Sequence, residues 1–152
     1  MRTEQERKRV GFFKVITKDV YITDDEKHFY DKTEAEEWDM YLKNKSRIYN
    51  EYRFEEISPL SFGLSYINNP VFAYKFHVED YNKEKELDII NYLHGTIIES
   101  GVDFRKGDVS VRSHLRNRID GWHIVILNNH LDRGYELHFF FMSDLVSKVN
   151  NE

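Results

Sequence analysis

Two segments near the C-terminal end of the sequence, residues 121–128 and 135–142, carry apolar side chains at both odd and even positions. A strand with one face in water alternates apolar and polar residues, so these two strands need cover on both faces or a central place in a sheet. The segment between them ends in Gly134 and is typical of a hairpin connection. We therefore expect a covered antiparallel hairpin.

Other runs of β-branched and aromatic residues predict further strands. They cover residues 10–23, as one long strand or as two with a break near Lys18, and residues 28–30, 47–57, 71–78 and 109–115. The first ten residues are polar, and we expect them to be frayed.

Two helices are predicted from their end signals. Thr33 followed by Glu36 forms a capping box, which predicts a helix reaching residue 45. Asp80 and Gly101 have the residue types of an N-cap and a C-terminal stop around residues 81–100. The expected fold is α+β, a mostly antiparallel sheet with two main helices packed on it. We expect one domain over residues 1–152, or two small subdomains at 10–57 and 71–149.

Composition excludes several function classes. The chain of 152 residues has no cysteine, which removes disulfides, thiolate nucleophiles and cysteine-ligated zinc. The charged N-terminal segment lacks the apolar stretch of a signal peptide, and no run approaches the roughly 20 apolar residues that span a bilayer. We therefore expect a cytoplasmic protein without a membrane partner.

Charge is strongly segregated along the chain. Residues 19–39 hold nine acidic residues against two lysines, whereas residues 105–118 hold five basic residues against one acid. Opposite fields on one small protein steer and orient a partner. The total charge of −5 disfavours nucleic acid as that partner.

The acidic segment predicts a negatively charged protein-binding surface, with simple solubility as the alternative. Exposed aromatic residues, two of them in the apolar loop at 58–70, would add contact area. The candidate partner-binding residues are Asp24, Asp25, Glu26, Tyr30, Glu34, Glu37, Tyr41, Phe62 and Tyr66.

The basic segment predicts a second kind of site. If residues 109–115 form a strand, every second side chain of the segment lies on one basic face that suits a phosphate or a nucleotide. The alternative is a solvated basic face, because the sequence has no glycine-rich phosphate loop. The candidate ligand-binding residues are Arg112, His114, Arg116, Arg118 and His123.

Histidines are the remaining candidates for chemistry. His123 and His138 lie on adjacent predicted strands, where they could pair as acid and base or share a metal. No H-E-x-x-H or H-x-H spacing and no third ligand accompanies them. We therefore expect no catalytic residue, no metal and no cofactor, and favour a non-enzymatic protein, with a hydrolase that uses His123 and His138 as the alternative. A homodimer remains open.

Residues 14–42 resemble the hairpin–helix opening of small uncharacterised bacteriophage proteins. The resemblance rests on Tyr21-Ile22-Thr23-Asp24, on Phe29 and on Glu34-Ala35-Glu36. It implies an inhibitor or adaptor that binds a host protein, including a protein of a host defence system. It transfers no catalytic residue.

Overall fold

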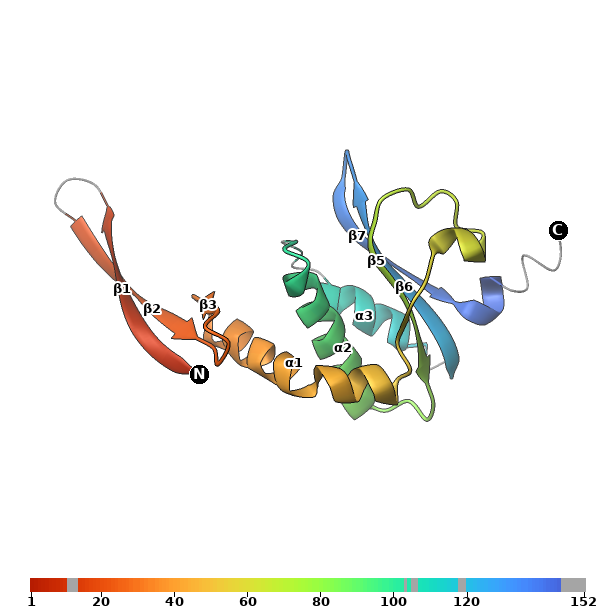
Figure 1. The fold of residues 1–152 in the computed structure, drawn as a ribbon, viewed down its shortest axis with the longest axis horizontal. Coiled ribbons are helices and arrows are strands. Elements are labelled where there is room, and N and C mark those ends of the chain that lie inside the picture. The colour runs from red at the N-terminus through yellow and green to blue at the C-terminus, as the bar shows by residue number, and fades with distance from the viewer. Residues whose placement is uncertain (11–13, 103, 105–106, 118–119, 146–152) are drawn as a thin grey trace. The chain divides into compact units, whose positions relative to one another are not determined.

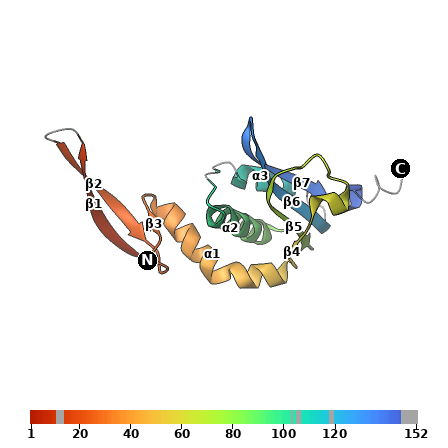
Figure 2. The ribbon, with the colours of Figure 1, turned by 45° about the horizontal axis from the view of Figure 1, so that its top comes forward.

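A computed structural model describes residues 1–10, 14–102, 104, 107–117 and 120–145 (Figures 1 and 2). Its elements are β1 (Arg2–Val10), β2 (Lys14–Ile22), β3 (His28–Phe29), α1 (Lys32–Glu51), β4 (Glu55–Glu56), the 3-10 helix η1 (Pro59–Phe62), β5 (Pro70–Val78), α2 (Lys83–Glu99), α3 (Gly107–Leu115), β6 (Gly121–His130) and β7 (Gly134–Phe141). Two antiparallel sheets and the helices confirm the α+β class. The chain divides into two compact units, Met1–Lys45 and Ser46–Glu152, whose boundary falls inside α1.

The first unit is built on a three-stranded sheet in the order β1-β2-β3. The expectation that the first ten residues are frayed is wrong, because β1 pairs with β2 from Arg2↔Ile22 to Val10↔Lys14. Backbone hydrogen bonds hold this strand, and they require no apolar side chain. Opposite charges also face each other at the Glu6↔Lys18 pair, which adds a small stabilisation.

Helix α1 begins and ends at residues other than those predicted. The Asp31 carboxylate accepts a hydrogen bond from the Glu34 amide at 3.1 Å, so Asp31 caps the helix and Thr33 lies inside it. Residues 47–51, predicted as strand, continue the helix to Glu51, and β4 retains only two residues. Ile48 and Tyr52 are both buried, and their spacing of four suits a helical face.

The second unit contains a four-stranded sheet in the order β4-β5-β6-β7. The predicted hairpin is confirmed, with register pairs from His123↔Phe141 to His130↔Gly134. Strand β6 lies between β5 and β7, and the four consecutive side chains from Ile124 to Leu127 are fully buried. Strand β6 is therefore central, as its sequence predicts, whereas β7 lies at the edge of the described sheet with half-buried side chains.

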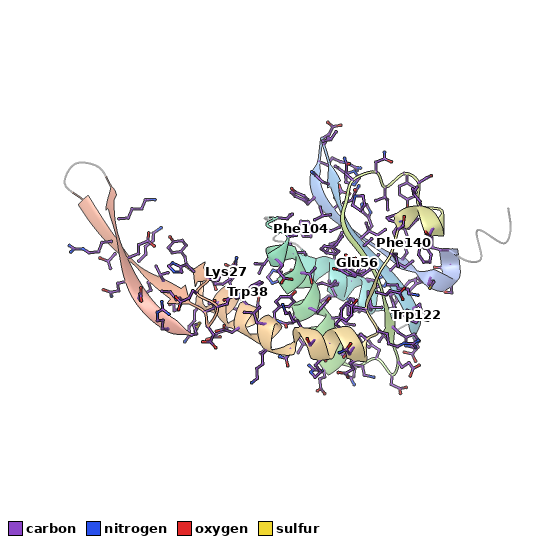
Figure 3. The ribbon with its side chains drawn as sticks, viewed as in Figure 1. Lys27, Trp38, Glu56, Phe104, Trp122 and Phe140 are labelled. Carbon is purple, nitrogen blue, oxygen red and sulfur yellow. The ribbon has the colours of Figure 1, made fainter. Side chains whose placement is uncertain are left out.

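Different elements cover the two faces of this sheet. On one face, Phe76 of β5 stacks on Phe54, and His114 of α3 lies against Phe139 and Phe141 of β7. On the other face, a core cluster that includes Leu64, Ile67, Ile124 and Ile126 packs with Phe140 from β7 and Phe62 from η1. Figure 3 labels Phe140 beside the segment that carries η1.

Helices α2 and α3 cover the first of these faces. Asn82, rather than Asp80, is the N-cap of α2, since its side chain accepts from the Lys85 amide at 2.9 Å. Gly101 follows the helix in a left-handed conformation at φ +78, as predicted. Residues 107–115 form helix α3, so the predicted strand at 109–115 is wrong. Val111, His114 and Leu115 are buried at helical spacing.

Replacement of the observed cap of α1 tests its helix start. Asp31→Ala removes the side-chain acceptor of the Glu34 amide, and we expect a loss of about 1 kcal/mol in unfolding free energy. Thr33→Ala, at an exposed position inside the helix, should change it by less than about 0.5 kcal/mol. Urea unfolding of both variants measures this. An equal or larger loss in Thr33→Ala would support the capping box instead.

Candidate functional site

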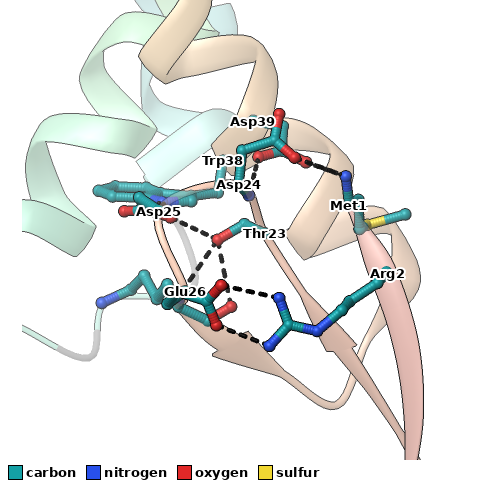
Figure 4. A network of polar contacts seen from close by, with 9 residues as sticks. Met1, Arg2, Thr23, Asp24, Asp25, Glu26, Trp38 and Asp39 are labelled. Carbon is teal, nitrogen blue, oxygen red and sulfur yellow. Dashed lines mark hydrogen bonds and ion pairs between the residues drawn. The ribbon is translucent and has the colours of Figure 1, made fainter.

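The acidic turn between β2 and β3 is the first candidate surface, and its central carboxylate is hydrogen-bonded to a buried tryptophan. Both oxygens of Asp25 lie 3.1 Å from the indole Nε1 of Trp38, and Oδ1 accepts from the Thr23 hydroxyl at 2.5 Å (Figure 4). Trp38 is buried, and Lys27 lies over its ring, with Nζ 5.2 Å from the centroid (Figure 3). Asp25 therefore has partners inside its own unit and links the turn to α1.

The neighbouring acids also have partners within this unit. Glu26 forms a two-pronged ion pair with the Arg2 guanidinium at 2.6 and 2.8 Å, and Asp24 accepts from the amine of Met1 at 2.7 Å (Figure 4). The hydrogen bonds from Arg2 lower the pKa of Glu26. Burial acts to raise the pKa of Asp25, but its hydrogen bonds from Thr23 and Trp38 outweigh this and lower the pKa. Charge reversal across the turn would remove these contacts within the unit.

The remaining partner-binding candidates are spread over both units. Tyr41 is only 3% exposed and packs on Trp38, so the expectation that it is exposed is wrong. The helical spacing of Tyr41 with Trp38 turns it toward the core. Tyr30 is exposed and donates to Glu6 at 2.9 Å, while Tyr66 is exposed and Phe62 is half-buried against the core cluster. Glu34 and Glu37 are exposed on α1.

The basic residues do not share a strand face, because their segment is helical. Arg112 and Arg116, four residues apart on α3, line a groove of about 430 Å³ against Tyr81, Asn82 and Lys83 at the start of α2. Glu86 also lines it, with Oε1 3.8 Å from Arg112 Nη1. Arg118 lies outside the described residues. The groove therefore retains two of the five predicted ligand-binding residues.

The other two, His114 and His123, form a buried pair between α3 and β6. Nε2 of His114 lies 2.8 Å from Nδ1 of His123, and Phe76, Phe139 and Phe141 surround the two rings. Burial, with a smaller effect of His123, lowers the pKa of His114 to about 4. Neither ring reaches the groove surface as a ligand, and the pair is part of the core.

The predicted pairing of His123 with His138 is wrong. In the hairpin register His123 faces Phe141 and His138 faces Ile126, and side chains of odd and even positions point to opposite faces of the sheet. His138 instead lies beside His130, with 3.2 Å between their Nε2 atoms. Burial lowers the pKa of His138.

Sequence reasoning missed a third polar residue at this second histidine pair. Glu136 Oε2 lies 3.3 Å from His130 Nε2 and 3.8 Å from His138 Nε2. The three side chains are half-buried on the hairpin of β6 and β7. Glu136 and His138 are two residues apart on β7, so their side chains lie on the same face of the strand. The sequence signal that could have predicted this cluster is the Glu-x-His spacing in one strand, directly after a strand that ends in a histidine.

The chain matches no protein-family model, no curated protein sequence and no solved structure. Within the described residues, no helix combines the length and the apolar character needed to cross a membrane.

The buried histidine pair makes stability depend on pH. An unfolded histidine takes up a proton near its ordinary pKa of 6.5, whereas His114 stays neutral in the folded protein down to about 4. The unfolded state therefore binds more protons within this window, and stability falls as the pH falls through it. We expect the titration of His114 to lower the free energy of unfolding by about 3 kcal/mol between pH 7 and pH 4.

Urea unfolding of the wild type and of His114→Phe across this pH range measures that loss. Phenylalanine keeps the contacts with Phe139 and Phe141 but does not titrate, so the variant should lose less stability on acidification. Identical pH slopes for the two proteins would contradict the assignment.

Proposed function

We propose that this protein is a non-enzymatic protein-binding factor that contacts its partner through the β1–β2 ribbon of its first unit. The observation that carries the proposal is an exposed stretch on both strands of this ribbon. Among the side chains of β2 whose burial is described, Val20 and Ile22 are buried, and they pair with Glu4 and Arg2. Beyond them, residues 5–8 and 17–19 are all exposed. Figure 1 shows the ribbon continuing past β3.

A stretch of paired strand with exposed side chains costs conformational entropy without a packing gain inside its own unit. Such a segment is typical of a contact surface, in which the partner supplies the burial. Strand β1 is also an edge strand of its sheet, with no further strand on its outer side among the described residues. Its charged side chains discourage pairing with identical copies, which favours a specific, charge-matched partner.

Charge indicates the kind of partner. The sequence from Arg7 to Lys18 carries five basic residues and no acid, and Arg7, Lys8 and Lys18 are exposed in the structure. The opposite end of the same unit carries the exposed acids Glu34 and Glu37. A partner surface with both signs of charge complements this arrangement better than a uniformly negative polymer does. We therefore favour a protein over a nucleic acid.

The resemblance of residues 14–42 to bacteriophage proteins extends this proposal to a bacterial host protein, met in the host cytoplasm. Inhibition or redirection of that protein, including a defence protein, is the expected consequence. No part of this proposal requires a catalytic residue.

Reversal of the ribbon charge tests the proposal. Arg7→Glu combined with Lys8→Glu should weaken binding of the main protein partner captured from bacterial lysate by more than about 10-fold, because opposite charges steer and hold the complex. The melting temperature should stay within a few degrees, since both side chains are exposed. Quantitative affinity capture at two salt concentrations, followed by titration with the identified partner, measures both effects.

The matched control is Lys32→Glu combined with Lys43→Glu, two exposed lysines outside the ribbon and outside the groove. This variant has the same change of net charge and should retain the partner. Equal binding by the ribbon variant and the wild type would refute the proposal. Recovery of nuclease-sensitive material in place of a protein would assign the ribbon to nucleic acid.

The groove between α2 and α3 favours a second candidate function, sequestration of a phosphate-bearing small molecule such as a nucleotide. Arg112 and Arg116 can donate to phosphate oxygens, and the start of α2 adds the positive end of a helix dipole. Glu86 opposes an anion there, so the ligand would have to displace its contact with Arg112.

A thermal-shift panel of nucleotides and other phosphorylated ligands tests the second candidate. We expect a saturable rise in melting temperature with at least one ligand, because binding to the folded state stabilises it. The double variant Arg112→Ala and Arg116→Ala should abolish the shift, and Lys43→Ala should leave it unchanged. No shift across the panel would remove this candidate.

A further inference from the structure

The hairpin of β6 and β7 brings two imidazoles and one carboxylate to a single point. One ligand atom from each of His130, Glu136 and His138 lies within 4.8 Å of the other two. The three separations are 3.2 Å between the imidazole Nε2 atoms, 3.3 Å from His130 to Glu136 and 3.8 Å from His138 to Glu136. These residues belong neither to the proposed contact ribbon nor to the groove.

The size of this triangle suits a tetrahedral metal ion. Zinc bonds to histidine nitrogen and carboxylate oxygen are about 2.0–2.2 Å long, which puts neighbouring ligands about 3.3–3.6 Å apart. The measured separations of 3.2, 3.3 and 3.8 Å lie around that distance. A metal ion therefore requires only small side-chain adjustments.

The backbone explains why these side chains converge. His130 ends β6 and accepts a hydrogen bond from the Arg133 amide at 3.3 Å, which closes the turn, and Gly134 follows with φ +81. His130 pairs with Gly134, so every second residue after Gly134 points to the face that carries His130. Glu136 and His138 occupy these positions. The strand that carries His130 is the most deeply buried in its sheet, which fixes the site on a rigid element.

Two nitrogen donors outside the cluster contact the imidazole of His130, one at each ring nitrogen. Asn128 accepts from the Asn69 amide through Oδ1 at 3.2 Å, which turns its Nδ2 toward His130 Nε2 at 3.4 Å. A neutral imidazole accepts a hydrogen bond at only one nitrogen, and the contact with Asn128 corresponds to the tautomer with an unprotonated Nε2, the form in which imidazole binds metals. A bound ion would replace this contact. The guanidinium of Arg133 opposes a cation here, with Nη2 3.4 Å from His130 Nδ1 and Nε 3.6 Å from Glu136.

We propose that His130, Glu136 and His138 form a binding site for one divalent transition-metal ion of the Zn²⁺ class. Such ions bind readily to a set of two imidazole nitrogens and one carboxylate oxygen, whereas Mg²⁺ and Ca²⁺ favour oxygen ligands alone. Three protein ligands leave the fourth tetrahedral position to water or to a group from a bound partner. The half-buried side chains leave the site open to ions from solvent.

Zinc titration of the full-length, untagged protein tests the site. We expect one Zn²⁺ per chain by calorimetry in competition with a chelator, and a saturable rise in melting temperature. His138→Ala and Glu136→Gln should each weaken binding by more than about 10-fold, since each removes or weakens a direct ligand. Arg133→Ala should tighten binding a few-fold, because it removes a competing positive charge from Glu136.

The matched control is His28→Ala, which removes an exposed histidine from the first unit and should not alter zinc binding. Co²⁺ provides a readout that folding defects do not mimic, since its visible absorption distinguishes tetrahedral from octahedral coordination. Circular dichroism of each variant is the control for folding. Zinc binding that His138→Ala leaves intact would overturn the proposal, as would the absence of saturable 1:1 binding to the wild type. In either case the three side chains form only a hydrogen-bonded cluster.

Discussion

Burial of strand β6 on both faces is the constraint on which the second unit depends. The side chains from Ile124 to Leu127 have no exposed surface, and each contributes about 2 kcal/mol through the hydrophobic effect. That burial requires β5 and β7 at its edges, α2 and α3 on one face, and the segment with η1 on the other. The ends of the same strand then position two polar groups, the buried His123 and the half-buried His130.

The sequence predicted the parts of the fold whose apolar pattern fits only one period. The hairpin at 121–128 and 135–142 is confirmed, because apolar residues at both odd and even positions favour a covered strand. The segments at 47–57 and 109–115 were assigned to strands because short windows fit two periods. Ile48 and Tyr52, or Val111 and Leu115, are four apart, which suits one face of a strand and one face of a helix. Strand β1 was missed because its backbone pairing leaves no apolar signature.

The candidate surfaces show a different limit. Composition located the acidic turn correctly. It could not show that Asp25 accepts a hydrogen bond from Trp38, because Trp38 lies 13 residues further along the chain. The ligand-binding residues separated for a similar reason, since the helical period of α3 turns His114 inward and Arg112 outward. The cluster at His130 combines residues from two strands, and only the register shows that Glu136 completes it.

Packing within the first unit does not account for the exposed, charged stretch of the β1–β2 ribbon. Amide hydrogen exchange of the full chain, with and without its captured protein partner, tests the proposed contact most directly. We expect slower amide exchange in β1 and β2 when the partner is bound, because a covered ribbon opens less often. Unchanged exchange in both strands, with protection confined to α3 and the start of α2, would contradict it.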